Sequence, residues 1–197
     1  LFTDFNSITE SFLQKCMTVL PPERKAKALR YRFAIDRKMC VVSYLLLLYA
    51  LHENYGIKNP EIDYSKNGKP YLIDYPAIHF NLSHCPNGCI CAVSDREIGV
   101  DIQDVRPFSW DVAKRVCCEN ELKLLHISND RDKMFTQIWA MKESYGKMIG
   151  YSIVNVKNID TTILKNKFKV ILLKNMAISL FVKCEKSFQL GDSSSEE

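Results

Sequence analysis

Residues 135–150 read FTQIWAMKESYGKMIG, and their spacing predicts a helix. Apolar side chains recur at steps of three and four residues, which gathers them into one stripe of a helix. The members of this stripe are Ile138, Met141, Tyr145 and Met148. Trp139, Glu143 and Lys147 are four residues apart and form a second face, with Glu and Lys in the order that favours an ion pair. Gly150 stands where a C-terminal cap is expected, so by itself the stretch describes an amphipathic helix with a surface salt bridge.

A second stretch, upstream of this helix, carries a carboxylate of its own. Residues 98–105 read IGVDIQDV, and their alternation of apolar and polar side chains predicts a half-buried strand. Asp101 and Gln103 then share one face, and the apolar residues share the other. Taken alone, Asp101 has the plainer interpretation of an edge-strand residue facing water. Together, Asp101 and Glu143 would make a hard oxygen site of the kind that Mg²⁺ uses beside substrate phosphates.

Four short motifs occur in order along the chain: GKP at 68–70, NLSH at 81–84, GVDIQ at 99–103 and W-x-x-K-E-x-x-x-K at 139–147. Any one of them is a weak signal, but the ordered set is specific. Together they resemble the signature of the 4'-phosphopantetheinyl transferases, in the longer, pseudo-dimeric type (the surfactin-synthetase-activating class) that activates peptide, polyketide and fatty-acid synthases. The resemblance extends from about Pro22 to Gly150 and is less clear beyond.

The resemblance implies an α+β fold, a pseudo-dimer of two similar lobes, each a small antiparallel sheet packed on a long helix, with the active site in the cleft between the lobes. We expect an N-terminal lobe over residues 1–98, a C-terminal lobe over 99–190 and a disordered tail over 191–197. The individual patterns predict helices at 8–20, from Pro22 onward, at 39–51 with an end at Gly56, at 110–117 and at 119–126, and strands at 78–83, 89–94, 159–164, 168–173 and 177–182.

The activity that the resemblance implies is transfer of 4'-phosphopantetheine from coenzyme A to a serine of an apo acyl or peptidyl carrier protein, with release of 3',5'-ADP. Asp101 and Glu143 would hold Mg²⁺, or Mn²⁺ in its place. Glu143, or a water that it orients, would accept the serine proton. Lys147 would bind coenzyme A and stabilise the departing phosphate.

The same resemblance implies further contacts with coenzyme A. Arg24 and Lys27 would hold the 3'-phosphate, and Lys69 would approach the nucleotide. Ser83 and His84 would also touch coenzyme A, with His84 on a phosphate. Taken alone, these residues have plainer interpretations, namely a solvated basic helix face, a surface turn and loop residues after a strand.

Two positions depart from the family pattern. Many members carry Glu where Gln103 stands, and Gln can still ligate a metal through its carbonyl oxygen or hold a metal-bound water, so Gln103 remains a candidate third ligand. The family also carries Arg near position 39, where this chain has Met39, with Arg37 and Lys38 as candidate replacements. These departures keep open a non-catalytic homologue that binds coenzyme A or a carrier protein without transferring anything.

The composition fits one domain or two small lobes, because 197 residues with 47% hydrophobic side chains can bury a sizeable core. A net charge of +4 suits a phosphate-bearing ligand or an acidic partner. The basic residues gather only at 24–32, without the long stripe and interleaved aromatics of a nucleic-acid reader, so no nucleic-acid partner is expected. The longest apolar run, 39–51, falls short of the about 20 residues that span a bilayer, so no membrane partner is expected either.

Eight cysteines are scattered along the chain, and no secretory signal opens it, so we expect free thiols and a cytoplasmic protein. We also expect a monomer. Cys85, Cys89 and Cys91 lie near His84, but they lack the paired C-x-x-C spacing of a structural zinc site. Cys89 and Cys91 are therefore predicted to be core thiols.

Overall fold

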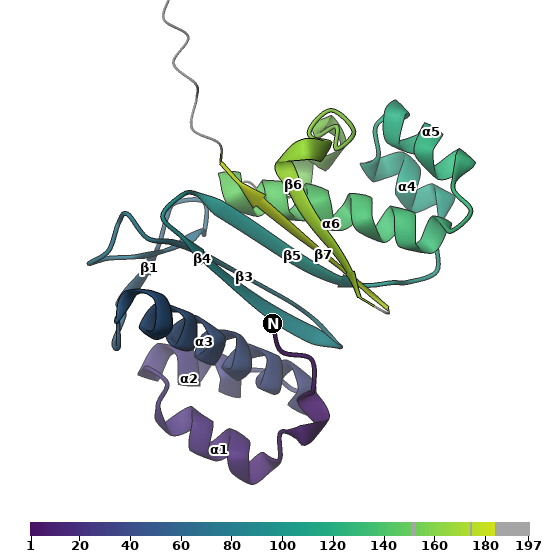
Figure 1. The fold of residues 1–197 in the computed structure, drawn as a ribbon. Coiled ribbons are helices and arrows are strands. Elements are labelled where there is room, and N and C mark those ends of the chain that lie inside the picture. The colour runs from purple at the N-terminus through teal and green to yellow at the C-terminus, as the bar shows by residue number, and fades with distance from the viewer. Residues whose placement is uncertain (151–152, 174, 184–197) are drawn as a thin grey trace, which may run out of the picture.

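The computed structural model describes residues 1–150, 153–173 and 175–183 of the chain. Helices and strands are mixed along the sequence, which confirms the α+β class (Figure 1). The helices are α1 Glu10–Thr18, α2 Pro22–Leu29, α3 Ala34–Tyr55, α4 Trp110–Val116, α5 Glu119–Ile127 and α6 Arg131–Ile149. The strands are β1 Ile62–Tyr64, β2 Pro70–Leu72, β3 His79–Cys85, β4 Gly88–Ser94, β5 Ile98–Asp104, β6 Phe168–Leu173 and β7 Met176–Val182. Short 3-10 turns cover Phe5–Ser7, Ile153–Asn158 and Lys165–Lys167.

The strands form three small antiparallel sheets, the hairpins β1-β2 and β3-β4 and a three-stranded sheet in the order β5-β7-β6. Figure 1 shows α3 alongside β3 and β4, and α6 alongside β5 and β7, with the strands between the two long helices. Among the residues that the structure describes, none of the helices combines the length and the apolar character needed to cross a bilayer.

Side chains of β3 join it to β5 without a backbone ladder. The Oδ1 atom of Asn81 accepts the N–H of Val100 at 3.0 Å, and the Oγ atom of Ser83 accepts the N–H of Ile102 at 3.3 Å. Asn81 and Ser83 are alternate residues of β3, and their partners are alternate residues of β5, so the two strands run parallel at this joint. The NLSH motif therefore has a structural task, because its side-chain oxygens satisfy backbone donors that would otherwise be buried without a partner.

The contact between β5 and α6 is made by backbone atoms at Gly99. A Cβ at this position would lie 1.9 Å from the carbonyl oxygen of Ser144 and 2.6 Å from the amide nitrogen of Met148, so only glycine fits. Since side chains alternate along a strand, Asp101 and Gln103 share the face of Gly99 and point toward α6. The expectation of a half-buried strand is wrong, because residues 98–102 are all buried between α6 and the strands on the other side.

The helix ends follow the sequence signals closely. Gly56 and Gly150 adopt left-handed conformations, with φ of 69° and 75°, just after α3 and α6, which confirms the two predicted C-terminal caps. Asp130 caps the start of α6 by accepting a backbone N–H. The first helix is capped by Thr9, whose side chain accepts the N–H of Phe12, and it begins later than predicted because a 3-10 turn at Phe5–Ser7 precedes it.

The C-terminal strands are confirmed at β6 and β7, but the strand predicted at 159–164 is wrong. Asp160 accepts the backbone N–H and the hydroxyl of Thr162, which holds the segment in a turn. Thr161 is buried and donates twice to Glu121. These side-chain hydrogen bonds replace a strand ladder. The predicted tail at 191–197 lies outside the described residues.

Candidate functional site

Asp101 lies at the centre of the site and is 1% exposed. Its Oδ1 atom accepts hydrogen bonds from Lys147 Nζ at 2.6 Å and from Ser83 Oγ at 2.7 Å. Its Oδ2 atom accepts from Gln103 Nε2 at 2.9 Å. Lys147 also donates to Ser83 Oγ at 2.8 Å. Four residues predicted from sequence to form the site thus belong to one hydrogen-bonded group, contributed by β3, β5 and α6.

Glu143 lies one helical turn before Lys147 on α6. Its Oε1 atom is buried and has no hydrogen-bond partner. Burial raises the pKa of Glu143, the Asp101 carboxylate raises it further, and Lys147 opposes both. Lys147 pairs with Asp101 and not with Glu143, so the ion pair favoured by the helical spacing gives way to a tertiary one.

This donor set fits a divalent cation. Two carboxylates from different elements lie within electrostatic reach of each other, and one has a buried oxygen without a partner. A buried polar atom of this kind calls for an explanation, and a role as a metal ligand is one that matches carboxylate chemistry. The positive charge beside Asp101 comes from Lys147. A metal ligated by Asp101 would therefore have to share this carboxylate with the ammonium group or displace it.

His84 sits at the surface beside this group. Partial burial of the imidazole lowers the pKa of His84, and the Lys147 and Lys27 ammonium groups lower this pKa further. The carboxylates of Asp36 and Asp101 act in the opposite direction and raise it. These influences place Lys27 of α2 and His84 of β3 in the same charged neighbourhood as the Asp101 group. The structure therefore brings part of the predicted coenzyme A contact set toward the predicted metal ligands.

Arg24 and Arg37 each carry a buried Nε atom without a hydrogen-bond partner. Arg24 also stacks over the Tyr44 ring, with Cζ at 4.7 Å from the ring centre. Of the two candidates to replace the arginine expected near position 39, Lys38 is already engaged, since it donates to a backbone carbonyl at 3.0 Å. Met39 itself is 6% exposed and belongs to the core. Of the two candidates, Arg37 is thus the one with a buried donor that has no partner.

The unpartnered buried side-chain atoms fall on residues for which a ligand contact is predicted. Within the described ranges, they belong to Arg24, Arg37 and Glu143. The sequence predicts a phosphate contact for Arg24 and a metal contact for Glu143, and Arg37 is a candidate phosphate contact. Unsatisfied buried groups are costly, so each of these atoms has the unused hydrogen-bonding capacity that a polar ligand would satisfy.

Lys69 has a protein partner in this structure. Its Nζ atom donates to the carbonyl oxygen of Met148 near the end of α6. Its contact with the nucleotide of coenzyme A, which the resemblance implies, stays a prediction.

Lys142 belongs to the W-x-x-K-E-x-x-x-K motif, although the motif predicts no role for it. Lys142 is 1% exposed, pairs with Glu121 Oε2 at 2.8 Å and donates to the carbonyl oxygens of Val156 and Ile159. A signal was available, because Lys142 is four residues after Ile138 and so falls on the buried stripe of α6. A lysine at such a position needs a buried partner.

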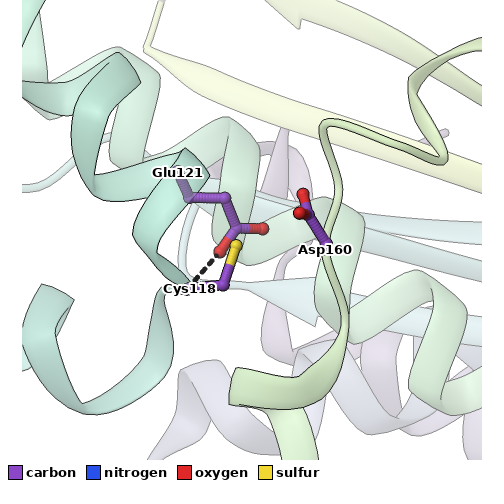
Figure 2. Close-up of side chains that lie close together, drawn as sticks. All are labelled: Cys118, Glu121 and Asp160. Carbon is purple, nitrogen blue, oxygen red and sulfur yellow. Dashed lines mark hydrogen bonds between the residues drawn. The ribbon is translucent and has the colours of Figure 1, made fainter.

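Figure 2 shows the side chains of Cys118, Glu121 and Asp160 close together, with their ligand-type atoms within 4.8 Å of one another. Burial would raise the pKa of Asp160, but hydrogen bonds, first among them one from Thr162, outweigh it and lower that pKa to about 2. The charge of Glu121 is already balanced by Lys142. We therefore interpret this cluster as structural, with the Glu121–Lys142 ion pair joining α5 to α6 and hydrogen bonds of Asp160 joining α5 to the turn at 160–162.

Comparison with known proteins identifies the family of the chain. Residues 6–96 match the family model "4'-phosphopantetheinyl transferase, N-terminal", and residues 97–190 match the model of the 4'-phosphopantetheinyl transferase superfamily. The chain is 34% identical over 161 residues to the 4'-phosphopantetheinyl transferase HetI of Nostoc sp., covering 77% of this chain and 68% of that protein. This chain belongs to the 4'-phosphopantetheinyl transferase superfamily.

Particular relatives include two Bacillus proteins. The chain is 32% identical over 135 residues to 4'-phosphopantetheinyl transferase psf-1 of Bacillus pumilus, covering 66% of this chain and 58% of that protein. It is 31% identical over 142 residues to 4'-phosphopantetheinyl transferase Sfp of Bacillus subtilis, covering 70% and 63%. The matches thus span 58% and 63% of these two relatives. The holo-[acyl-carrier-protein] synthase of Thermotoga maritima superposes with a TM-score of 0.31 and 17% identity, over 44% of this chain and 61% of that one.

Proposed function

We propose that this protein transfers 4'-phosphopantetheine from coenzyme A to a serine of an apo acyl or peptidyl carrier protein. The observation that carries the proposal is the group formed by Asp101, Lys147 and Glu143, in which one carboxylate is engaged with an ammonium group and the other keeps a buried oxygen without a partner. The family membership and the names of the relatives support the same reaction class.

In the proposed reaction, the serine oxygen attacks the phosphorus that bears the pantetheine arm. The new P–O bond forms as the bond between this phosphorus and the bridging oxygen of 3',5'-ADP breaks. The serine proton passes to the carboxylate of Glu143, directly or through a water, and a raised pKa suits this base to its task. Lys147 stabilises the negative charge that builds on the departing phosphate.

The residues that would hold Mg²⁺ or Mn²⁺ are Asp101, Glu143 and Gln103. When bound, the metal supplies neutralisation of the diphosphate charge. Gln103 donates to Asp101 through its Nε2 atom, and its side-chain oxygen is then the atom suited to a metal or a metal-bound water. Because Mg²⁺ keeps several waters, two carboxylates are sufficient protein ligands.

We further propose two lobes, at residues 1–98 and 99–190, with coenzyme A in a cleft between them. The packing of α3 on β3 and β4, and of α6 on β5 and β7, supports two similar halves. Arg24, Lys27, Arg37 and His84 would hold the phosphates from the first half. Since one chain supplies both sets of side chains, a monomer is sufficient for the reaction.

The test is a mass-shift assay on a panel of apo carrier proteins incubated with coenzyme A and Mg²⁺. The wild-type protein should add the mass of phosphopantetheine to at least one carrier, whereas Asp101→Asn and Glu143→Gln should add none while remaining folded. Asp111→Asn, an exposed acid on α4, is the matched control and should retain the activity. Wild-type turnover in either site variant would refute these roles. Binding of coenzyme A without any transfer would instead favour the non-catalytic homologue.

A further inference from the structure

Lys69 is held in place by the turn that joins β1 to β2. Its backbone N–H donates to Ser65 Oγ at 3.1 Å, and its carbonyl accepts the N–H of Ser65 at 2.9 Å. Gly68, just before it, has a φ of 78°, a conformation that glycine adopts without strain. The base of the Lys69 side chain is therefore fixed, and the side chain itself is half-buried.

From this turn, Lys69 reaches the C-terminal end of α6, 79 residues further along the chain. Its Nζ atom donates to the carbonyl oxygen of Met148, and its stem packs on Gly150, where Cδ lies 3.6 Å from the position that a Cβ would take. The last carbonyl groups of a helix lack intrahelical partners, and the helix dipole favours a positive charge at this end. Lys69 supplies both a donor and a charge.

The carbonyl that Lys69 binds belongs to the residue next to Lys147. Lys147 lies in the last turn of α6, and its ammonium group must stay at 2.6 Å from Asp101 and 2.8 Å from Ser83. Only two helical positions, Met148 and Ile149, follow Lys147 before the helix ends. Helix ends fray readily, so a side chain that holds this turn in place also fixes the position of the Lys147 backbone.

We propose that Lys69 is a positioning residue for Lys147: by binding the Met148 carbonyl, it holds the last turn of α6 so that the Lys147 ammonium stays against Asp101 and Ser83. This role differs from the nucleotide contact expected for Lys69. Its structural part concerns the ligand-free protein, and its kinetic part rests on the proposed transferase function.

The structural part is tested by hydrogen exchange of the ligand-free protein. Lys69→Met removes the donor and keeps most of the stem, and Lys66→Met, an exposed lysine of the same turn, is the matched control. We expect amides of residues 145–150 to exchange about tenfold faster in Lys69→Met than in wild type, with the rest of α6 unchanged, and no change in Lys66→Met. Equal exchange in Lys69→Met and wild type would overturn the proposal, because a nucleotide contact alone has no effect in the free protein.

The kinetic part separates positioning from binding. We expect Lys69→Met to lower kcat for transfer by roughly tenfold or more, with the KM for coenzyme A changed by less than about twofold. Lys69→Arg, which keeps a donor and a charge, should recover a large part of the lost kcat. A raised KM with unchanged kcat would assign Lys69 to nucleotide binding and overturn the proposal. If the wild-type protein transfers nothing, the proposed function fails, while hydrogen exchange still tests whether Lys69 holds the last turn of α6.

Discussion

The ammonium nitrogen of Lys147 lies 2.6 Å from Oδ1 of Asp101, although one residue comes from α6 and the other from β5. A cation in this position balances a carboxylate that is almost fully buried. The same carboxylate is proposed to ligate a metal. The lysine and the metal therefore compete for one oxygen atom, or divide the two oxygens between them.

Competition of this kind predicts that Lys147→Ala binds Mn²⁺ more tightly than wild type when coenzyme A is absent. The gain should be about tenfold, because a positive charge beside the ligand is removed, and transfer should nevertheless be lost. The free Mn²⁺ signal in electron paramagnetic resonance titrations measures the affinity. Lys114→Ala, an exposed lysine on α4, should leave it unchanged. Unchanged or weaker Mn²⁺ binding by Lys147→Ala would contradict the competition.

Glu143 should make the stability of the metal-free protein depend on pH. Its pKa is higher in the folded protein than in the unfolded chain, so the folded state binds more protons, and wild type loses stability as pH rises through this interval. Thermal unfolding in a chelator should therefore give Glu143→Gln the higher Tm at neutral pH, with the difference vanishing below about pH 4, where both states are protonated. Added Mg²⁺ should raise the Tm of wild type and not that of Glu143→Gln. A lower Tm for Glu143→Gln in chelator would show that Oε1 has a partner after all.

Gln103→Glu should increase the affinity of the proposed enzyme for Mg²⁺. An additional carboxylate next to Asp101 lowers the Mg²⁺ concentration needed for half-maximal transfer by about tenfold, because hard cations favour anionic oxygen ligands. Without metal, the same change places like charges together and should lower the Tm. Parallel Mg²⁺ titrations of the two proteins measure the shift. A wild-type protein that stays inactive at every Mg²⁺ concentration, beside an active Gln103→Glu variant, would mean that Gln103 has abolished metal use.

Lys142 and Glu121 form a buried pair whose loss should be costly. Lys142→Met leaves the Glu121 carboxylate buried without its cation, and we expect a loss of about 3–5 kcal/mol in the free energy of unfolding. Adding Glu121→Gln should recover part of this loss, since the unpaired charge is removed. Urea unfolding of the single and double variants gives the values, with Lys123→Met on the exposed side of α5 as the control. A double variant less stable than Lys142→Met would refute the pairing as the cause.

Periodicity and end signals made the two central elements predictable. The 3.6-residue spacing predicted that α6 is a helix, and Gly150 predicted where this helix ends. The alternation around Asp101 predicted the strand β5. The proximity of Asp101 and Glu143 was inferred from the order of the motifs, and the structure places them within electrostatic reach. Local patterns record which side of an element is apolar, and both acids lie off that side, so their burial could not be predicted from the patterns alone.

Partners far apart in the sequence could not be predicted in the same way. Spacing along α6 suggested Glu143 as the partner of Lys147, but a buried carboxylate on β5 attracts the ammonium more strongly than a neighbour on the helix does. The strand predicted at 159–164 failed because its alternation is also compatible with a turn held by Asp160. Nothing in the local pattern could reveal that Lys69 would bind the Met148 carbonyl.

At Gly99 the strand and the helix meet main chain to main chain, with a hydrogen atom as the whole side chain between them. No rotamer can lengthen or shorten such a contact. The separation between the backbone of Asp101 on the strand and that of Glu143 on the helix is therefore set by this main-chain contact. Even a methyl group at position 99 would push the helix away from the strand, and two carboxylates moved apart in this way could no longer bind one metal ion.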